Sequence, residues 1–389
     1  MGVLPISAQI VDEQGRYVDT VFHDNVDRTA EDFVIASVLV VDPGSVLYSV
    51  LGHSSIRLQC PTFDMDYCFT YESEDERQKI LSFLAGKLKM GLFIIDFDDY
   101  CNIYSKDGRG VYEYKLNLPI NVKRELWRVL EENLQKEMQV PYDYLNRGCA
   151  IKIKDFVKEA LGEMVIEYDD SLYTYSPTAR ELCIKNSKRA LWVQFVALFL
   201  VGNDADIPLI GEKQLIIPKD LVNAWQKATV NGELLLSNEP TILVEGQPQV
   251  DDVWFTPMVL AFVLLLLAVV NLFWDRPYFD WLMLIVQTIV GCVMIYLIAF
   301  SELCCTDWNW LVIPFNPLVV IFWYWRKYWA LPYVCVLVVW CVVMSAITIW
   351  GHVLVDWSHI IMVLSFVIVM IKQSSVFLSL LDNNRVNNN

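Results

Sequence analysis

Hydrophobic residues follow two different patterns along this chain of 389 residues. Before about residue 256, apolar positions alternate with polar ones or recur at helical spacing, as in a water-exposed domain. Beyond that point they form long blocks, separated by short aromatic and charged stretches. The change predicts an N-terminal segment over 1–30, a folded domain over 31–227, a linker over 228–255 and a membrane domain over 256–389.

The pattern before residue 227 predicts an α+β domain, in which a small antiparallel sheet packs on helices. "HSSIRLQC" (53–60) and "DMDYCFTY" (64–71) alternate between polar and apolar residues, which is typical of two strands of a hairpin. The other predicted elements are a strand and Pro-Gly turn over 33–45, a helix over 75–88, a strand over 109–119, a helix over 120–138 and a helix from about Cys149 to Gly162.

Five apolar blocks are candidates for membrane-spanning helices, because a helix needs about 20 apolar residues to cross the hydrocarbon core. They cover about 257–274, 279–300, 311–325, 331–350 and 358–372. The third is the weakest, since "IPFNP" carries two prolines and an asparagine. We expect it to be kinked or broken and to face protein, or to be a re-entrant or interfacial segment.

Lysine and arginine in the short loops predict the orientation of these helices. Arg276 lies in the first loop, Arg326 and Lys327 in the third, and Lys372 and Arg385 in the tail, whereas the second and fourth loops have none. Loops with these cations are expected in the cytoplasm. The N-terminal domain is therefore expected on the outer side of the membrane.

The charge of the chain argues against nucleic-acid binding. Its net charge is −16, and nearly all of the excess acidity lies before Thr256. Phosphates attract basic surfaces and repel an acidic one. An exported domain also needs an export signal. We expect "LPISAQ" (4–9) to be the end of a signal peptide whose remainder has been removed; the alternative is that the first hydrophobic helix itself drives export.

Five cysteines precede the membrane part, at positions 60, 68, 101, 149 and 183. Outside the cytoplasm they could oxidise, and an odd number leaves at least one unpaired within the chain. The pairing itself stays open. Because the sequence has no Cys-x-x-Cys pair and no cluster of histidine and cysteine, we expect no metal site and no cofactor.

One cysteine and one histidine are candidates for chemistry. Cys149 stands at the predicted start of a helix, where the dipole and unpaired N–H groups favour a thiolate and could hold an oxyanion. His53 has a pKa suited to taking the thiol proton. Asp66 on the next strand is our candidate for orienting the imidazole, with Asp64 and Ser55 as competitors.

Simpler interpretations apply to both residues. A cysteine at a helix start is more often inert packing, and a lone histidine on a strand is more often a structural hydrogen-bonding group. The spacing alone does not join the two. The order, with histidine before cysteine, is also the reverse of ordinary papain-type enzymes.

A family resemblance adds weight to the pairing. "DPGSVLYSVLGHSSIR" (42–57) resembles the pattern P-G-S-x-x-Y-S-x-x-G-H-x-x-x-R of the Lnb-type lipoprotein N-acyltransferases of bacterial envelopes. The similarity continues through "DYCFTY", "GRGVYEYKLNL", "YDYLNRGCAIKIKDF", "TAREL", "VGNDADIPL" and "WNWLVIPFNPL". Gly148, Ile151 and Lys154 depart from the family's usual asparagine, threonine and arginine.

The resemblance implies a circularly permuted papain-like domain in the periplasm, followed by a transmembrane domain. It implies His53 as the base and Cys149 as the nucleophile. Arg57, Tyr71, Asp66 and Ser55 then become candidates for supporting or binding the substrate.

The function expected from this resemblance is acyl transfer at the bacterial inner membrane. An acyl ester of a membrane lipid would acylate Cys149, and the thioester would pass its acyl chain to the α-amine of a diacylglyceryl-modified lipoprotein. A membrane phospholipid is the expected partner, and whether the chain comes from it or from the lipoprotein itself stays open. Two alternatives remain: a membrane-tethered cysteine peptidase or amidase acting on cell-wall peptides, and a non-catalytic binding module in the envelope.

Overall fold

The computed structural model describes most of the chain, and the predicted segment 1–30 with its signal-peptide-like stretch lies outside the described residues. The described residues are 34–46, 49–61, 64–73, 79–135, 140–141, 143, 145–237, 239–247, 254–274 and 277–374. The chain forms two compact units. One consists of Met1–Leu182 with Pro208–Val250, and the other of Cys183–Ile207 with Asp251–Asn389.

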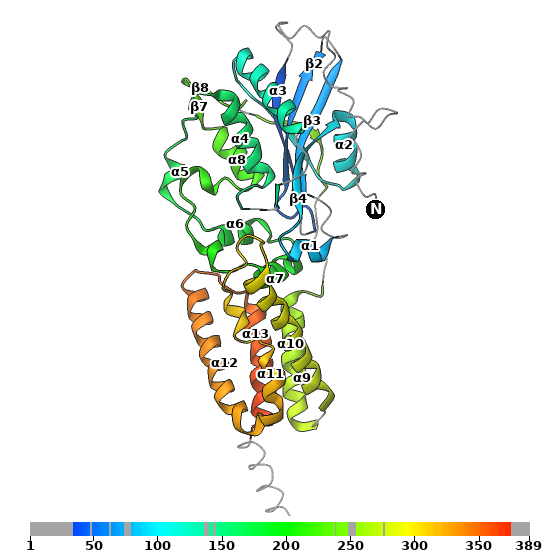
Figure 1. Cartoon of the computed structure of the whole chain (residues 1–389), viewed down its shortest axis with the longest axis vertical. Helices are drawn as coiled ribbons and strands as arrows, with labels where there is room; N and C mark the ends of the chain where they lie inside the picture. The colour runs from blue at the N-terminus through cyan, green and yellow to red at the C-terminus, as the bar shows by residue number, and fades with distance from the viewer. Residues whose placement is uncertain are drawn as a thin grey trace, which may run out of the picture. The chain divides into compact units, whose positions relative to one another are not determined.

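The first unit is built on a seven-stranded antiparallel sheet, which confirms the α+β class (Figure 1). Its strand order is β6-β4-β3-β2-β1-β5-β9. The strands are β1 (Ile35–Val41), β2 (His53–Cys60), β3 (Met65–Ser73), β4 (Lys89–Asp96), β5 (Val111–Lys115), β6 (Val140–Pro141) and β9 (Thr241–Val244). The predicted hairpin is the β2–β3 pair.

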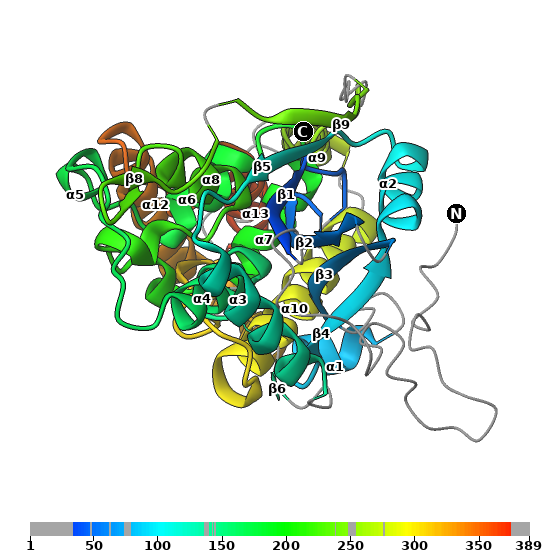
Figure 2. The same ribbon diagram turned by 90° about the horizontal axis from the view of Figure 1, so that it is seen from above.

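Helices cover both faces of this sheet. They are α1 (Ile80–Leu84), α2 (Phe97–Lys106), α3 (Ile120–Leu134), α4 (Cys149–Leu161), α5 (Ser171–Thr174), α6 (Ala179–Asn186), whose last four residues belong to the second unit, and α8 (Pro218–Trp225). A 3-10 turn η3 (Gly211–Gln214) and a small hairpin of β7 (Thr229–Val230) and β8 (Glu233–Leu234) complete the unit. Figure 2 shows α2 on one side of the sheet and α3 and α4 on the other.

Alternation along the strands supplies a separate core to each face. Ile56 of β2 packs in the larger core with Trp127 of α3 and Trp225 of α8, both fully buried. Leu39 of β1 points the other way and packs with Tyr100 of α2. Each large apolar side chain buried in this way contributes roughly 1.5–3 kcal/mol. The sheet is therefore held from both sides.

The structure corrects the predicted boundaries in two places. Strand β9 belongs to the sheet beside β5, although 228–255 was predicted as a linker. Segment Cys183–Ile207 belongs to the second unit, although it was predicted within 31–227. Its apolar helix α7 (Leu191–Leu200) explains why, because Phe195 is part of the buried core of that unit.

The second unit is helical. It contains α7, α9 (Pro257–Trp274), α10 (Pro277–Phe300), α11 (Leu318–Phe322), α12 (Arg326–Ile349), α13 (Trp357–Gln373) and the 3-10 turns η2 (Asn203–Asp206), η4 (Trp310–Val312) and η5 (Trp323–Trp325). Helices α9 and α10 and residues 328–349 of α12 are long and apolar enough to cross a membrane, while α7 and α13 are shorter apolar helices.

The third predicted span, 311–325, is broken, as its prolines and asparagine indicated. Its backbone carbonyl at Pro314 accepts hydrogen bonds from Gln287 Nε2 at 2.8 Å and from Tyr333 Oη at 3.2 Å. Gly291 lets this segment approach α10, because a Cβ there would lie 2.7 Å from the Phe315 carbonyl oxygen. Irregular backbone is thus satisfied inside protein, as an apolar surrounding requires.

Candidate active site

His53 is the first residue of β2. The residue before it, Gly52, occupies a position that tolerates only glycine. Gly52 has φ of 83°, and a Cβ there would meet the Val41 carbonyl oxygen at 2.8 Å. The His53 ring lies on the α2 side of the sheet and stacks on Tyr104, with 6.4 Å between the ring centroids. Its side chain is 16% exposed, so the ring is shielded but still reachable.

A chain of hydrogen bonds fixes the His53 ring. Its Nε2 lies 2.6 Å from Thr70 Oγ1, and Thr70 Oγ1 donates to Glu72 Oε1 at 3.0 Å. Because the only hydroxyl proton of Thr70 goes to Glu72, Thr70 must accept from Nε2–H. Nδ1 is then the nitrogen with a free lone pair, and it is the atom able to act as a base.

Burial and a nearby cation keep this imidazole neutral. Burial, and to a smaller extent the positive charge of Arg109, lower the pKa of His53 to about 3. Arg109 is itself buried, donates from Nε to the Asp42 carbonyl at 2.7 Å and lies over the Tyr104 ring at 4.9 Å. Burial also raises the pKa of Glu72, and this effect is larger than the lowering caused by the hydrogen bond from Thr70.

Cys149 is the first residue of α4, as the sequence predicted. Gly148 is the N-cap, and its carbonyl accepts the first helical bond, from Lys152 N at 3.0 Å. Within the described part of the chain, the N–H groups of Cys149, Ala150 and Ile151 have no backbone acceptor. These donors and the positive end of the helix dipole favour a negative charge at this point.

Ser54 is the residue of β2 that meets the Cys149 thiol. Burial raises the pKa of Cys149, while the hydroxyl and backbone N–H of Ser54 and the backbone N–H of Ala150 lower it. The Ser54 hydroxyl is completely buried and makes no hydrogen bond of regular geometry with any described residue. We therefore take the Ser54–thiol approach as a close electrostatic contact rather than as a well-formed hydrogen bond.

His53 and Cys149 share neighbours at one end of β2, which each approaches from a different face of the sheet. Ser54, next to His53, contacts the thiol; the charge of Glu72 also acts on the thiol, and the thiolate acts on Tyr104. No hydrogen bond joins the imidazole to the sulfur among the described residues. Direct proton transfer needs heavy atoms within about 3 Å, or one bridging water, and such contacts are often looser before substrate binds.

Asp66 is not the residue that orients His53, which corrects the expectation from the sequence. The β2–β3 register places Asp66 opposite Gln59, six residues from His53 along the strand. At about 3.3 Å per residue, this separates them by roughly 20 Å. Asp66 instead accepts from Arg57 at 2.8 and 2.6 Å. Asp64, the other carboxylate considered, lies in the turn before β3.

Two of the substrate-binding candidates already have full sets of partners. All three guanidinium nitrogens of Arg57 donate to Asp66 or Glu113, and Phe97 covers the group at 3.3 Å. Ser55 Oγ lies 2.8 Å from Tyr100 Oη and is fully buried. These contacts are structural and leave neither side chain free for a substrate.

Tyr71 remains a candidate for contact with the substrate, because it lies beside the cysteine helix. Its ring packs edge-on against Phe156 of α4, with 6.5 Å between centroids. The amine of Lys152, also on α4, is 5.8 Å from the centre of the ring. Tyr71 is thus held on the face of the sheet that carries Cys149.

Comparison of the sequence with known protein families finds one matching family model in each part of the chain. Residues 24–178 match the Lnb N-terminal periplasmic domain, and residues 249–383 match the Lnb transmembrane domain. The chain belongs to the Lnb family. It is accordingly a membrane protein with a periplasmic part and is associated with lipoprotein modification. No curated protein and no solved structure matches the chain.

Several site residues of this Lnb protein were missed from the sequence. Thr70 and Glu72 could have been found by counting the hairpin register from its turn, since Ser55 pairs with Thr70. Tyr104 could not, because it lies on α2, for which no sequence pattern gave a position. Arg109 begins the predicted strand 109–119, but nothing in the sequence placed that strand beside His53. Within the described residues, no group of three or more histidine, cysteine or acidic side chains could hold a metal ion.

Proposed function

We propose that this Lnb protein is an N-acyltransferase of the bacterial inner membrane that acts through an acyl-Cys149 thioester. The acyl donor is a membrane phospholipid, and the acceptor is the α-amine of a diacylglyceryl-modified lipoprotein. The observation that carries the proposal is the thiol at the first turn of α4, held against Ser54 beside a histidine with one free ring nitrogen. His53 and Cys149 both belong to the part of the chain that matches the periplasmic domain.

The first half-reaction transfers the acyl chain to the enzyme. His53 Nδ1 accepts the thiol proton as Cys149 Sγ attacks the ester carbonyl of the phospholipid. The oxyanion that forms is stabilised by the unpaired N–H groups of the first turn of α4. Collapse breaks the ester C–O bond, and His53 returns its proton to the leaving alkoxide. The products are the Cys149 thioester and a lysophospholipid.

The second half-reaction passes the chain to the lipoprotein. The neutral α-amine attacks the thioester carbonyl, and His53 accepts a proton from the nitrogen. The C–S bond breaks, the thiolate takes the proton from His53, and an N-acyl amide leaves. At rest both groups are neutral, because burial lowers the pKa of His53 and raises that of Cys149, so charge develops only during each transfer.

The membrane domain gives a physical reason for this choice of substrates. Both proposed substrates keep their acyl chains in the bilayer, and the apolar helices of the second unit anchor the enzyme there. A thioester open to bulk water would be lost by hydrolysis, so a site restricted to lipidic substrates protects it.

Trapping the intermediate tests the proposal. The full-length protein is placed in phospholipid nanodiscs without acceptor and digested, and the peptide containing Cys149 is weighed by mass spectrometry. We expect an added acyl chain that hydroxylamine removes. The Cys149→Ala variant should lack this adduct, and Cys101→Ala, at a second free thiol, should keep it.

Analysis of lipoproteins from cells gives the results that would contradict the proposal. If cells with only Cys149→Ala still N-acylate their lipoproteins fully, Cys149 is not the nucleophile. If their lipoproteins are unaffected and cell-wall peptides change instead, the peptidase alternative is the correct one.

A further inference from the structure

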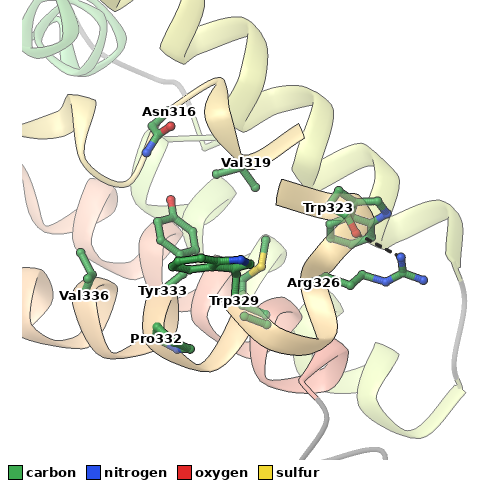
Figure 3. A pocket seen from close by; sticks show the side chains of 10 residues that line it. Asn316, Val319, Trp323, Arg326, Trp329, Pro332, Tyr333 and Val336 are labelled. Atoms are coloured by element: carbon green, nitrogen blue, oxygen red, sulfur yellow. Dashed lines mark hydrogen bonds between the residues drawn. The ribbon is translucent and has the colours of Figure 1, made fainter. Parts of the chain in front are cut away.

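The second unit contains an apolar cavity beside the start of α12. The cavity has a volume of about 220 Å³ and lies between the η5 region, the first turns of α12 and Met370 of α13 (Figure 3). Apolar protein cavities of about 150 Å³ are large enough to bind benzene. This cavity therefore has room for a segment of a hydrocarbon chain.

A proline inside α12, Pro332, forms part of the cavity wall. It has no N–H to donate, and its ring pushes against the carbonyl of the preceding turn, which bends a helix. Tyr333 Oη holds the opposite wall in place through the Ile313 and Pro314 carbonyls, at 3.4 and 3.2 Å.

One end of the cavity carries a cation, and the rest is nearly all apolar or aromatic. Figure 3 shows Arg326 beside Trp323 at one end and Asn316 and Val336 at the other. Arg326 donates from Nη1 to the Trp323 carbonyl at 3.1 Å and lies over the Trp323 ring at 5.2 Å.

Among the residues that the structure describes, the guanidinium of Arg326 has only neutral partners. Its Nε donates to Gln373 Oε1 at 3.0 Å. Asp280, the nearby carboxylate of this network, is bound instead by Lys372 and by Gln373 Nε2, each at 2.9 Å. No described carboxylate forms an ion pair with Arg326. A charged side chain in an apolar surrounding without a counter-ion is costly, so an anion is expected beside it.

From these observations we propose that the cavity binds one acyl chain of an anionic glycerophospholipid, whose phosphate pairs with Arg326. The bidentate donors of a guanidinium match phosphate oxygens. The groove opens outward, because Trp329 is 54% and Val336 48% exposed. A lipid can therefore enter sideways from the bilayer.

This lipid is distinct from the proposed acyl donor. Arg326 begins α12, which ends at Ile349, so this residue lies about 36 Å from the other end of the helix. The residues that line the cavity belong to the second unit, whereas the proposed acyl donor reacts with a cysteine of the first unit.

Native mass spectrometry of the full-length Cys149→Ala protein tests the site without turnover. Phosphatidylglycerol and phosphatidylcholine are added separately at equal concentration. We expect one tightly retained phosphatidylglycerol and weaker phosphatidylcholine. Arg326→Gln should weaken phosphatidylglycerol binding about tenfold and remove the preference, while Arg326→Lys should keep part of it.

A pair of matched variants tests the groove itself. Val336→Trp blocks the opening and should lower retention of both lipids, whereas Val342→Trp, at an exposed position further along α12, should not. Melting temperatures confirm that each variant is folded. Equal retention of the two lipids by the unaltered protein, or unchanged phosphatidylglycerol binding in Arg326→Gln or Val336→Trp, would overturn the proposal. Neither result would bear on acyl transfer at Cys149.

Discussion

Strand β2 carries two groups of polar side chains on the same face, four residues apart, and they differ in how fully they are paired. Arg57, near the middle, has every guanidinium nitrogen bound to Asp66 or Glu113. His53, at the start, uses one ring nitrogen, and the other has no hydrogen-bond partner among the described residues.

The difference teaches how to separate structural from reactive polar residues. A buried charge with all its donors satisfied holds strands together. Removing one partner is destabilising, because it leaves the other charge buried without compensation. A buried titratable group with one open atom and a shifted pKa is instead able to exchange a proton. Both residues belong to the same sequence motif, and only the contacts distinguish them.

Replacing His53 should give the largest effect on rate. His53→Gln keeps a polar side chain but removes the base, so we expect acyl transfer to fall by about 10²–10⁴-fold. The rate of Cys149 acylation in nanodiscs measures this. The variant should fold normally, and a rate within twofold of the unaltered protein would remove His53 from the mechanism.

Replacing Arg57 should affect stability and not chemistry. Arg57→Met leaves Glu113 buried without its cation, which costs about 3–5 kcal/mol and lowers the melting temperature on the order of 10 °C. Thermal unfolding in detergent measures the change, while the rate per folded molecule should stay the same. The control Arg128→Gln removes exposed ion pairs on α3 and should change the melting temperature little.

Thr70 and Asp66 offer a sharper test of which residue orients His53. Thr70→Val removes the acceptor of Nε2–H, so the ring loses its fixed tautomer, and the acylation rate should fall about tenfold. Asp66→Asn should leave the rate per folded molecule unchanged. The reverse pattern would restore Asp66 as the orienting residue.

The smallest effect is expected in the pH dependence. Because the folded pKa of His53 is about 3, below its ordinary value of 6.5, the imidazole stays an active base between pH 7 and 5. Arg109→Gln removes a neighbouring positive charge and should raise this pKa, so that acylation begins to decline by pH 5. Acylation rates of the unaltered protein and of Arg109→Gln are measured from pH 5 to 8. Identical pH profiles of the two proteins would exclude an influence of Arg109 on His53.

The same shift predicts a loss of stability in acid. Between pH 6.5 and about 3 the unfolded chain protonates His53 while the folded chain does not, so stability falls as pH falls through this window. The slope from this residue is at most about 1.4 kcal/mol per pH unit. Melting curves of the unaltered protein should therefore fall more steeply over this range than those of His53→Gln.

Local pattern was enough for the elements that hold the site. Alternation predicted β2 and β3, and helical spacing with a terminal glycine predicted α4 from Cys149 to Gly162, which has φ of 61°. The broken third membrane segment was visible in its prolines. Strand β4, helix α2 and the sheet strand β9 were not predicted, because their short apolar runs have no distinct period.

The sequence by itself determined the two-part organisation, the α+β class and the positions of His53 and Cys149 on their elements, because hydrophobic period and helix caps act over a few residues. Only the tertiary structure decided that Thr70 and Glu72 stand beside His53, that Arg57 is fully paired and that Ser54 contacts the thiol. Strand register and helix packing bring together residues distant in the chain, and a shift of one residue in register would exchange every such partner.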